Sequence, residues 1–456
     1  MSRPDRVVIL GAGLTGMSAA YHLRRGKHPN VALFEKETTP GGLVRSKQNG
    51  AYRFDYTGHF LHFRDPKIAA QVNEWLPGEL TTVTRDAWIH SHRVYTPYPF
   101  QTNLYGLPLP VVNECLLGYI AARDQDRAPE RTPERDAPDF ETWIRHSVGN
   151  GIARHFMIPY NTKLWGVPPS AMTTDWMNRF VPPAPLDKVV AGALGLRDAS
   201  SGYNARFEYP RHGGIQILSE AWARHAGPIE YAHEAVRIDA VNRRVGFDTG
   251  LETDYQTLIS TLPLPVLCAL IADLPEPVRA ACDRLSWSSV WALCLGIKAN
   301  HTGGRHWVYV PEEKYPFYRV GCFSNIAPSM APDGHSSVWV EQSYNRDRPL
   351  DAEQARADAI SGLKDMGWLK DESEIAVEWP LRMPYAYVIY DAHHAEATAT
   401  IHEFLRAHGI LSTGRYGKWD YSSMEDAILY GRDAAQSLLG IPQNAPTTPS
   451  PGTDLK

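Results

Sequence analysis

The sequence predicts an α/β protein with a Rossmann-like dinucleotide-binding domain, an inserted helical domain and a large antiparallel β-sheet domain. Residues 7–23 (VVILGAGLTGMSAAYHL) read as an apolar strand, a glycine turn and an Ala/Leu-rich helix. Residues 104–200 carry apolar side chains spaced by three and four positions, which indicates helices. Residues 288–345 contain several runs of alternating side chains, which are typical of an antiparallel sheet.

Gly11, Gly13 and Gly16 occupy the turn between the first strand and its helix. In order, they allow a sharp turn, close approach of the backbone to a pyrophosphate, and tight packing of helix on strand. The start of the helix offers N–H groups and a positive dipole end to phosphates. Glu35 ends the next predicted strand (VALFE), where a carboxylate can accept both ribose hydroxyls of an adenosine. This unit predicts a dinucleotide site rather than a glycine-rich turn alone.

A second glycine pair, Gly41–Gly42, lies in the run KETTPGGLVRS directly after Glu35. The run resembles the FAD-binding stretch of the amine oxidase and protoporphyrinogen oxidase superfamily. The resemblance implies that this pair, with Leu43, passes close to the phosphate and ribityl part of the flavin. NAD(P)-dependent dehydrogenases do not usually carry it. We therefore predict a Rossmann-like FAD-binding domain, with NAD as the alternative cofactor.

Composition excludes several other classes of protein. The chain has 456 residues and a net charge of −5, and no Lys/Arg run indicates a nucleic-acid surface. Its five cysteines are scattered and form no C-x-x-C pair, which fits reduced thiols in the cytoplasm and argues against a cysteine-built metal site. No apolar stretch approaches the roughly 18 residues that span a bilayer. We expect a cytoplasmic protein without a signal peptide or a metal, which could form a homo-oligomer.

The remaining segments complete the domain prediction. Residues 205–262 return to strands, and residues 405–440 read as a strand that feeds a helix. Residues 124–138 are polar and proline-bearing, which predicts a surface loop, and residues 441–456 are predicted to be a disordered tail. The predicted domains are FAD-binding at 1–75, 205–262 and 405–440, helical at 104–200, and antiparallel sheet at 76–103 and 263–404.

A second group of motifs resembles the UDP-galactopyranose mutase family, especially its eukaryotic-type members. The motifs occur in the family's order and extend to about residue 431: Thr57-Gly58-His59, Tyr98-Pro99-Phe100-Gln101, FMIPYNTKLWGVPPSAMTTDWMNR at 156–179, and the segment 309–319. The resemblance implies a mutase that converts a nucleoside-diphosphate pyranose, UDP-linked in the family, into a furanose. In the family, N5 of reduced FAD attacks the anomeric carbon and expels UDP, without net redox change. Such a site needs fixed cations and phenol donors around the diphosphate.

The resemblance also implies roles for individual residues. Arg179 and Arg319 match the arginines that clamp the diphosphate, and His59 matches the histidine whose backbone carbonyl lies near flavin N5. These three are the candidate catalytic residues. Tyr98 and Gln101 match residues that contact the uracil, and Phe156 and Asn161 match residues that line the nucleotide pocket. Trp165 matches the tryptophan of the mobile flap, and Asn204 matches a residue that faces the sugar. Tyr309, Tyr387 and Tyr421 match phosphate-binding tyrosines, and Tyr421 is also a flavin contact.

Several departures from the family concern the sugar and the reductant. Thr57 replaces the first of two glycines before the histidine, and Ile326 stands where a tyrosine is often found. The run after Tyr421 is SSMEDAIL and lacks the family's amides, which would bind sugar hydroxyls. We therefore expect an altered sugar: galactose, arabinose, a deoxysugar and an aminosugar stay open. Eukaryotic-type members accept NADPH through two arginines and a serine. Arg85 and Arg415 match the two arginines, whereas Ala87 stands in place of the serine.

Two other functions stay open. A conventional FAD-dependent oxidase or desaturase would need an apolar tunnel or an aromatic cage instead of arginines aimed at a diphosphate. A nucleotide-sugar or flavin-binding protein without catalysis is the third hypothesis, because the amides near Tyr421 are missing. Some residues of the motifs have a purely structural interpretation, as packing tryptophans or helix-capping carboxylates: Trp307, Trp339, Trp419, Asp420, Glu425 and Asp426.

Overall fold

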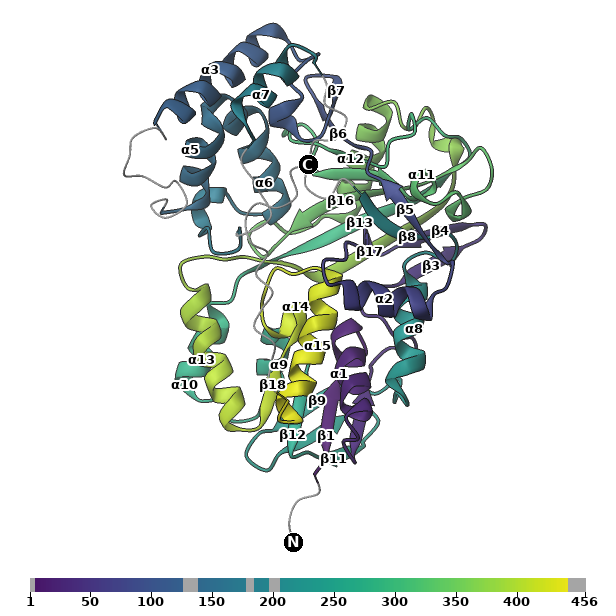
Figure 1. Cartoon of the computed structure of the whole chain (residues 1–456), viewed down its shortest axis with the longest axis vertical. Helices are drawn as coiled ribbons and strands as arrows, with labels where there is room; N and C mark the ends of the chain where they lie inside the picture. Colours follow the sequence, from purple (N-terminus) through teal and green to yellow (C-terminus); the bar gives the residue numbers. More distant parts are fainter. Residues whose placement is uncertain (1–4, 126–137, 178–183, 197–205, 442–456) are drawn as a thin grey trace.

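The computed structural model describes residues 5–125, 138–177, 184–196 and 206–441. A four-stranded sheet with its helices forms the lower part of the molecule, and a seven-stranded sheet crosses the middle (Figure 1). The helices of residues 109–193 form a separate group at the upper left. This arrangement confirms the predicted α/β fold class with its Rossmann-like part, helical part and large sheet.

The four-stranded sheet is parallel throughout. In spatial order its strands are β18 (Ile410–Ser412), β12 (Thr257–Ser260), β1 (Val7–Leu10) and β2 (Val31–Phe34). Strand β1 is buried along its whole length, as expected of a parallel strand covered on both faces. Helix α1 (Leu14–Arg25) packs against α15 (Met424–Leu438), where a Cβ on Gly431 would lie 2.2 Å from the carbonyl oxygen of Thr15.

Within residues 205–262, where the sequence predicts a return to strands, the structure contains one helix that was not predicted. Helix α8 (Gln216–Ala226) stands between β8 (Arg206–Pro210) and β9 (Ala235–Asp239) and packs on α1. Its buried Leu218, Ala221 and Trp222 have the spacing of one helix face. The neighbouring strands β9, β10 (Arg244–Phe247) and β11 (Glu252–Asp254) form a three-stranded antiparallel sheet.

The large sheet is mixed, which corrects the expectation of a purely antiparallel one. Strands β14 and β6 pair in parallel, whereas every other pair of neighbouring strands in this sheet is antiparallel. The β6–β7 hairpin comes from a distant part of the sequence and joins at the edge of the sheet, so no connecting turn dictates its direction. The spatial order is β17 (Ile375–Val388), β13 (Trp287–Ile297), β16 (Ser336–Tyr344), β15 (Arg319–Cys322), β14 (Trp307–Tyr309), β6 (Ala87–Ser91) and β7 (Val94–Pro97).

The helical part confirms the helices expected between residues 104 and 200. Its elements are α3 (Leu109–Gln125), α5 (Phe140–Ile152), the π-helical turn η2 (Ala153–Met157), α6 (Ile158–Trp165) and α7 (Leu186–Ala193). Helices α3 and α5 approach so closely that a Cβ on Gly151 would lie 2.4 Å from the carbonyl oxygen of Glu114. Most of the predicted loop at 124–138, and all but Ile441 of the predicted tail at 441–456, lie outside the described residues.

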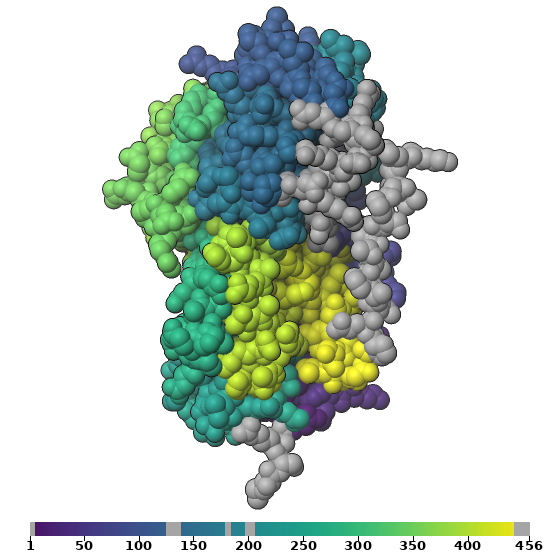
Figure 2. Space-filling view, turned by 90° about the vertical axis from the view of Figure 1, so that its left-hand side faces the viewer, coloured from purple at the N-terminus to yellow at the C-terminus, as the bar shows by residue number. Residues whose placement is uncertain are grey.

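The helical part rests on the C-terminal region of the chain. Figure 2 shows its helices (blue) directly above the residues from about 394 onward (yellow-green and yellow). A backbone hydrogen bond of 2.6 Å from Thr173 to the carbonyl oxygen of Tyr390 crosses this boundary. The remaining elements are β3 (Ser46–Asn49), β4 (Tyr52–Asp55), α2 (Pro66–Trp75), β5 (Leu80–Thr84), η1 (Phe100–Thr102), η3 (Pro169–Ala171), α9 (Leu264–Leu270), α10 (Glu276–Asp283), α11 (Phe323–Ile326), η4 (Pro328–Met330), α12 (Ala352–Asp365), η5 (Glu372–Glu374), α13 (His394–Ala407) and α14 (Gly414–Gly417).

Candidate functional site

The glycine turn after β1 forms the first candidate region. Gly11 has a φ of +95°, and a Cβ on Gly16 would lie 1.9 Å from the carbonyl oxygen of Gly11. A Cβ on Gly13 would meet nothing within 4 Å among the described residues, so the turn is open on that side. Gly13 is the N-cap of α1, and no side chain in the described part of the chain caps this helix. The first N–H groups of α1 are therefore available to an anion.

The second glycine pair lies against this open turn. The N–H of Gly41 donates to the carbonyl oxygen of Ala12 at 2.8 Å, and a Cβ on Gly42 would lie 3.6 Å from the Cα of Gly13. Leu43 then packs against side chains of the large sheet. The loop therefore connects the glycine turn to the large sheet.

Glu35 stands at the edge of the same turn. Its side chain is buried, and its carboxylate accepts hydrogen bonds from the N–H groups of Ala12 at 2.7 Å and Glu37 at 3.0 Å. Each carboxylate oxygen keeps acceptor capacity for a hydroxyl. The open glycine turn, the free helix amides and this carboxylate together fit the pyrophosphate and ribose of a dinucleotide such as FAD.

An aromatic cluster forms the second candidate region, where α6 faces the large sheet. The ring of Tyr309 lies 5.0 Å from that of Tyr98 and 5.3 Å from that of Tyr160, and the rings of Tyr387 and Tyr421 are 6.2 Å apart. Burial raises the pKa of Tyr98 and Tyr160, and it raises the pKa of Tyr387 to about 12. These three phenols therefore keep their protons at neutral pH and can donate hydrogen bonds.

Arg319 is held within this cluster by Glu341. Its Nε and Nη2 donate to the two carboxylate oxygens at 3.0 and 2.7 Å. Glu341 is 1% exposed and also accepts from the hydroxyl of Tyr318 at 2.5 Å and from the indole N–H of Trp339 at 2.6 Å. The Nη1 of Arg319 makes no hydrogen bond within the described ranges. This nitrogen is available to a ligand.

Arg415 and His59 lie close to this ion pair. The Arg415 guanidinium donates to the carbonyl oxygens of Ser422 and Ala386 and lies 4.9 Å from the ring of Tyr421. The Arg415 guanidinium forms no ion pair with a described carboxylate. Burial lowers the pKa of His59 to about 4, against a backbone hydrogen bond that raises it, and its Nδ1 has no partner among the described residues. At neutral pH the region therefore holds a guanidinium, that of Arg415, without a carboxylate at ion-pair distance among the described residues.

Helix α6 supplies the opposite wall. Trp165 is fully buried, and its ring lies 5.5 Å from those of both Tyr387 and Tyr421. The side chain of Asn161 orients it, because the amide accepts from the indole N–H at 3.2 Å and donates to the carbonyl oxygen of Met157 at 2.7 Å. The predicted flap tryptophan is therefore packed inside the protein in this structure.

The predicted nucleotide pocket is partly filled by its own aromatic rings. Phe156, on the π-helical turn, stacks on Phe100 at 5.0 Å and on Tyr160 at 5.3 Å. The Arg85 guanidinium lies 5.0 Å from the ring of Tyr98. Gln101 is partly exposed on η1, beside Phe100. Two predicted residues, Arg179 and Asn204, lie outside the described residues.

Three further residues belong to the cluster although the sequence did not predict them: Glu341, Tyr160 and Tyr318. The signal for Glu341 was present, because a lone carboxylate interrupts the apolar alternation of SSVWVEQSY. A buried charge in such a strand requires a partner. Tyr160 and Tyr318 had no comparable signal, since tyrosines in apolar segments commonly serve packing.

The predicted capping role holds for only one of three carboxylates. Asp426 forms a capping box with Ser423 at the start of α15, as expected. Glu425 instead accepts from the guanidinium of Arg64 and from the N–H groups of Arg64 and Asp65, each at 2.8 Å. Asp420 accepts from two tyrosine hydroxyls. Glu425 therefore links α15 to the segment before α2, and Asp420 links its own loop to Tyr390 and to α15. The position of these carboxylates in the sequence did not reveal these contacts.

The departures from the family also have structural counterparts. Thr57 adopts a φ of +68°, a conformation that favours glycine and that a β-branched residue adopts only at a cost. Ile326 and Ala87 are both buried in the core. Trp307, Trp339 and Trp419 are buried as well, as the packing interpretation predicted.

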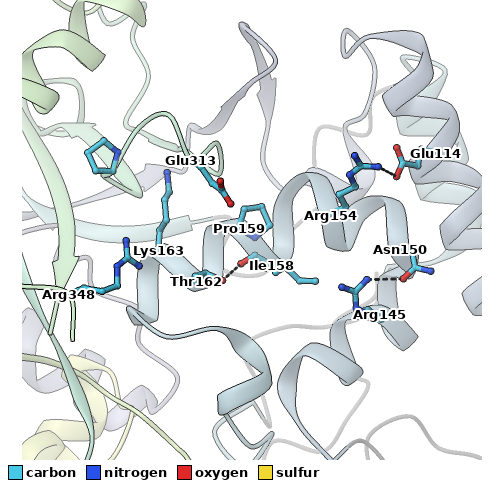
Figure 3. Close-up of a pocket in the computed structure, with 11 residues that line it drawn as sticks. Glu114, Arg145, Asn150, Arg154, Ile158, Pro159, Thr162, Lys163, Glu313 and Arg348 are labelled. Atoms are coloured by element: carbon cyan, nitrogen blue, oxygen red, sulfur yellow. Dashed lines mark hydrogen bonds and ion pairs between the residues drawn. The ribbon is translucent and has the colours of Figure 1, made fainter. Parts of the chain in front are cut away.

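A pocket of about 780 Å³ lies on the other side of α6, lined by Pro159 and Lys163 (Figure 3). Three of its basic groups already have partners: Arg154 pairs with Glu114 at 3.3 Å, Arg145 pairs with Glu141 at 2.7 Å, and the Lys163 ammonium donates to backbone carbonyl oxygens of residues 312 and 315. Burial lowers the pKa of Lys163 to about 7. None of the predicted site residues lines this pocket, so we do not assign the chemistry to it.

In the described part of the chain, no group of three or more His, Cys, Asp or Glu side chains is arranged to hold a metal ion. No helix of the same residues combines the length and the apolar character needed to cross a bilayer.

The parallel sheet, the open glycine turn and the buried carboxylate at its edge define a dinucleotide-binding protein of the flavoprotein type. Residues 14–439 match the family described as flavin containing amine oxidoreductase, and the chain belongs to this family. Membership supports FAD as the cofactor, in agreement with the fit of the first candidate region.

Known proteins of this fold differ in how much of the chain they match. A crystal structure of reduced UDP-galactopyranose mutase is 29% identical and covers 96% of this chain and 94% of its own, with a TM-score of 0.87. A putative protoporphyrinogen oxidase from Exiguobacterium sp. 255-15 covers 96% and 99% at 17% identity, with a TM-score of 0.73. Human (Homo sapiens) prenylcysteine oxidase 1 is 39% identical over 61 residues, which is 13% of this chain and 12% of that protein.

Proposed function

We propose that this protein is a flavin-dependent mutase that interconverts the pyranose and furanose forms of a nucleoside-diphosphate sugar, with UDP as the nucleotide. The observation that carries the proposal is the likeness to UDP-galactopyranose mutase at 29% identity over 96% of the chain. The similarity to prenylcysteine oxidase 1 is confined to 12% of that protein, and the likeness to the protoporphyrinogen oxidase, at 17% identity, supports the fold alone.

The aromatic cluster supports this proposal by its chemistry. A departing diphosphate gains negative charge, so cations and neutral donors that are already in place stabilise it. Arg319 offers its Nη1, Arg415 adds a cation that is not ion-paired with a described carboxylate, and phenols such as Tyr387 donate hydrogen bonds. Arg179, outside the described residues, is the second proposed diphosphate ligand.

Reduced FAD, when bound, supplies an electron-rich nitrogen for reaction at the anomeric carbon. The chain itself holds the diphosphate and excludes water behind Trp165, which is fully buried. His59 stays neutral at pH 7, so its ring does not compete with the arginines for the anion. The identity of the sugar depends on residues 422–429, which replace the family's amide-bearing run, and on Asn204, which matches a residue that faces the sugar.

We further propose NADPH as the reductant. Arg85 and Arg415 are its proposed phosphate contacts, and the position of Arg85 over the ring of Tyr98 places one of these cations beside the aromatic cluster. Anaerobic reduction of the bound flavin by NADPH, followed at about 450 nm, tests this step. If dithionite reduces the flavin and NADPH does not, NADPH is not the reductant. That result would not contradict the proposed mutase activity.

The decisive experiment is turnover of UDP-galactopyranose, UDP-arabinopyranose and the corresponding GDP- and dTDP-sugars by reduced and oxidised holoenzyme. We expect furanose product only from the reduced enzyme, with no stoichiometric consumption of reductant. Peroxide formation with an amine or a polyene, together with no binding of UDP, would favour an oxidase. Binding of UDP-sugars without turnover would favour the non-catalytic hypothesis.

A further inference from the structure

We propose that Tyr390 is a positioning residue that holds Tyr421 in the candidate site. The inference rests on the proposed function, in which Tyr421 contacts the diphosphate. Tyr390 follows β17 and is 6% exposed. Its hydroxyl accepts from the backbone N–H of Tyr421 at 2.8 Å and donates to Oδ1 of Asp420 at 2.5 Å. One phenol thereby fixes the backbone at the residue whose side chain enters the aromatic cluster.

The chain before Tyr421 needs such support because its backbone is strained. Trp419 adopts a φ of +62°, which a tryptophan rarely adopts, and the N–H of Asp420 donates to the carbonyl oxygen of Arg415 at 2.8 Å to close the turn. The Asp420 carboxylate accepts from the hydroxyls of both Tyr390 and Tyr430. Burial, reinforced by this carboxylate, raises the pKa of both phenols, so both remain donors.

The same residue also anchors the helical part of the chain. The carbonyl oxygen of Tyr390 accepts from the N–H of Thr173 at 2.6 Å. Three residues later, Trp176 packs on Tyr421 with ring centroids 5.8 Å apart and on Trp165 at 4.8 Å. Tyr390 therefore holds the backbone on both sides of the contact between Trp176 and Tyr421. Loss of its hydroxyl is expected to displace the Tyr421 ring relative to Arg415, now 4.9 Å away.

A double-mutant cycle on the holoenzyme tests this role. UDP affinity is measured by calorimetry for the unmodified protein, Tyr390→Phe, Tyr421→Phe and the double variant, together with the FAD content. We expect Tyr390→Phe to bind UDP roughly fivefold more weakly, the effect of one lost hydrogen bond. In the Tyr421→Phe background the same substitution should change UDP affinity little, because the affected phenol is already absent.

Tyr430→Phe is the matched control. It removes the other phenol from the same carboxylate, but Tyr430 makes no hydrogen bond to the backbone of Tyr421 within the described ranges. We expect Tyr430→Phe to change the thermal stability of the protein about as much as Tyr390→Phe does, but to leave the UDP affinity unchanged. Equal loss of UDP affinity in Tyr390→Phe and Tyr430→Phe, or additive effects in the cycle, would overturn the inference.

Two further outcomes are separable. If the unmodified holoenzyme binds no UDP, the proposed function fails, and this inference fails with it. If Tyr390→Phe is not recovered as a folded flavoprotein, the cycle is run with Asp420→Asn, which weakens the anchor of the Tyr390 hydroxyl. Its effect on UDP affinity must again vanish in the Tyr421→Phe background.

Discussion

Arg319 and Glu341 are direct cross-strand partners in β15 and β16, and their side chains form two hydrogen bonds of 3.0 and 2.7 Å. The carboxylate is almost fully buried, whereas the Arg319 side chain is 18% exposed. The two hydrogen bonds to the buried carboxylate therefore fix the orientation of the Arg319 guanidinium. A rigid cation of this kind loses little entropy on binding an anion.

Glu341→Ala is expected to destabilise the protein by about 3–5 kcal/mol, because it leaves the Arg319 cation without its partner in a buried site. The measurement is the free energy of unfolding in urea. Glu141→Ala is the matched control, because the Glu141–Arg145 pair has the same 2.7 Å separation but is more exposed. The control should lose less than about 1 kcal/mol. Similar losses in both variants would show that Glu341 is not required to balance Arg319.

His59 is expected to make stability fall as the pH is lowered. Burial lowers its pKa from 6.5 to about 4. Within that range the unfolded chain binds a proton that the folded protein does not, so this contribution is present above pH 6.5 and is lost as pH falls toward 4. The slope it adds is at most about 1.4 kcal/mol per pH unit. His59→Gln should show a flatter dependence in urea unfolding at pH 4.5–7; parallel curves would contradict this prediction.

Gly13→Ala is expected to reduce FAD content at least about tenfold while leaving the fold intact. A Cβ there meets no described atom within 4 Å, so the new methyl group would occupy only the space left for the cofactor. Gly16→Ala should instead impair folding, since its Cβ would lie 1.9 Å from a carbonyl oxygen. Far-ultraviolet circular dichroism and flavin absorbance separate the two outcomes. Full FAD content in Gly13→Ala would place the pyrophosphate elsewhere.

Thr57→Gly is expected to stabilise the protein by about 1 kcal/mol relative to Thr57→Ala. Both variants lose the threonine side chain, but only glycine relieves the strain at a φ of +68°. Thermal unfolding of the two holoenzymes measures the difference. Equal melting temperatures would mean that the loop before His59 relaxes without a glycine.

Much of the fold could be predicted from local patterns. The turn at Gly11 to Gly16 followed by Glu35 depends on backbone requirements that act within one βαβ unit, and the structure places these residues together as expected. The parallel pairing of β14 with β6 was not predictable, because it joins strands separated by more than 200 residues. Helix α8 was missed for a related reason: it lies between strands in a region dominated by strand signals.

By itself, the sequence determined the dinucleotide-binding unit, the helical segment and the residue types available for an anion site, since each follows from spacing along a short stretch of chain. Tertiary structure alone decided which of those residues meet. Only folding brings Glu341 to Arg319 and Tyr390 to Tyr421, because hydrogen bonds between distant segments depend on how sheet and helices pack and leave no periodic trace in the sequence.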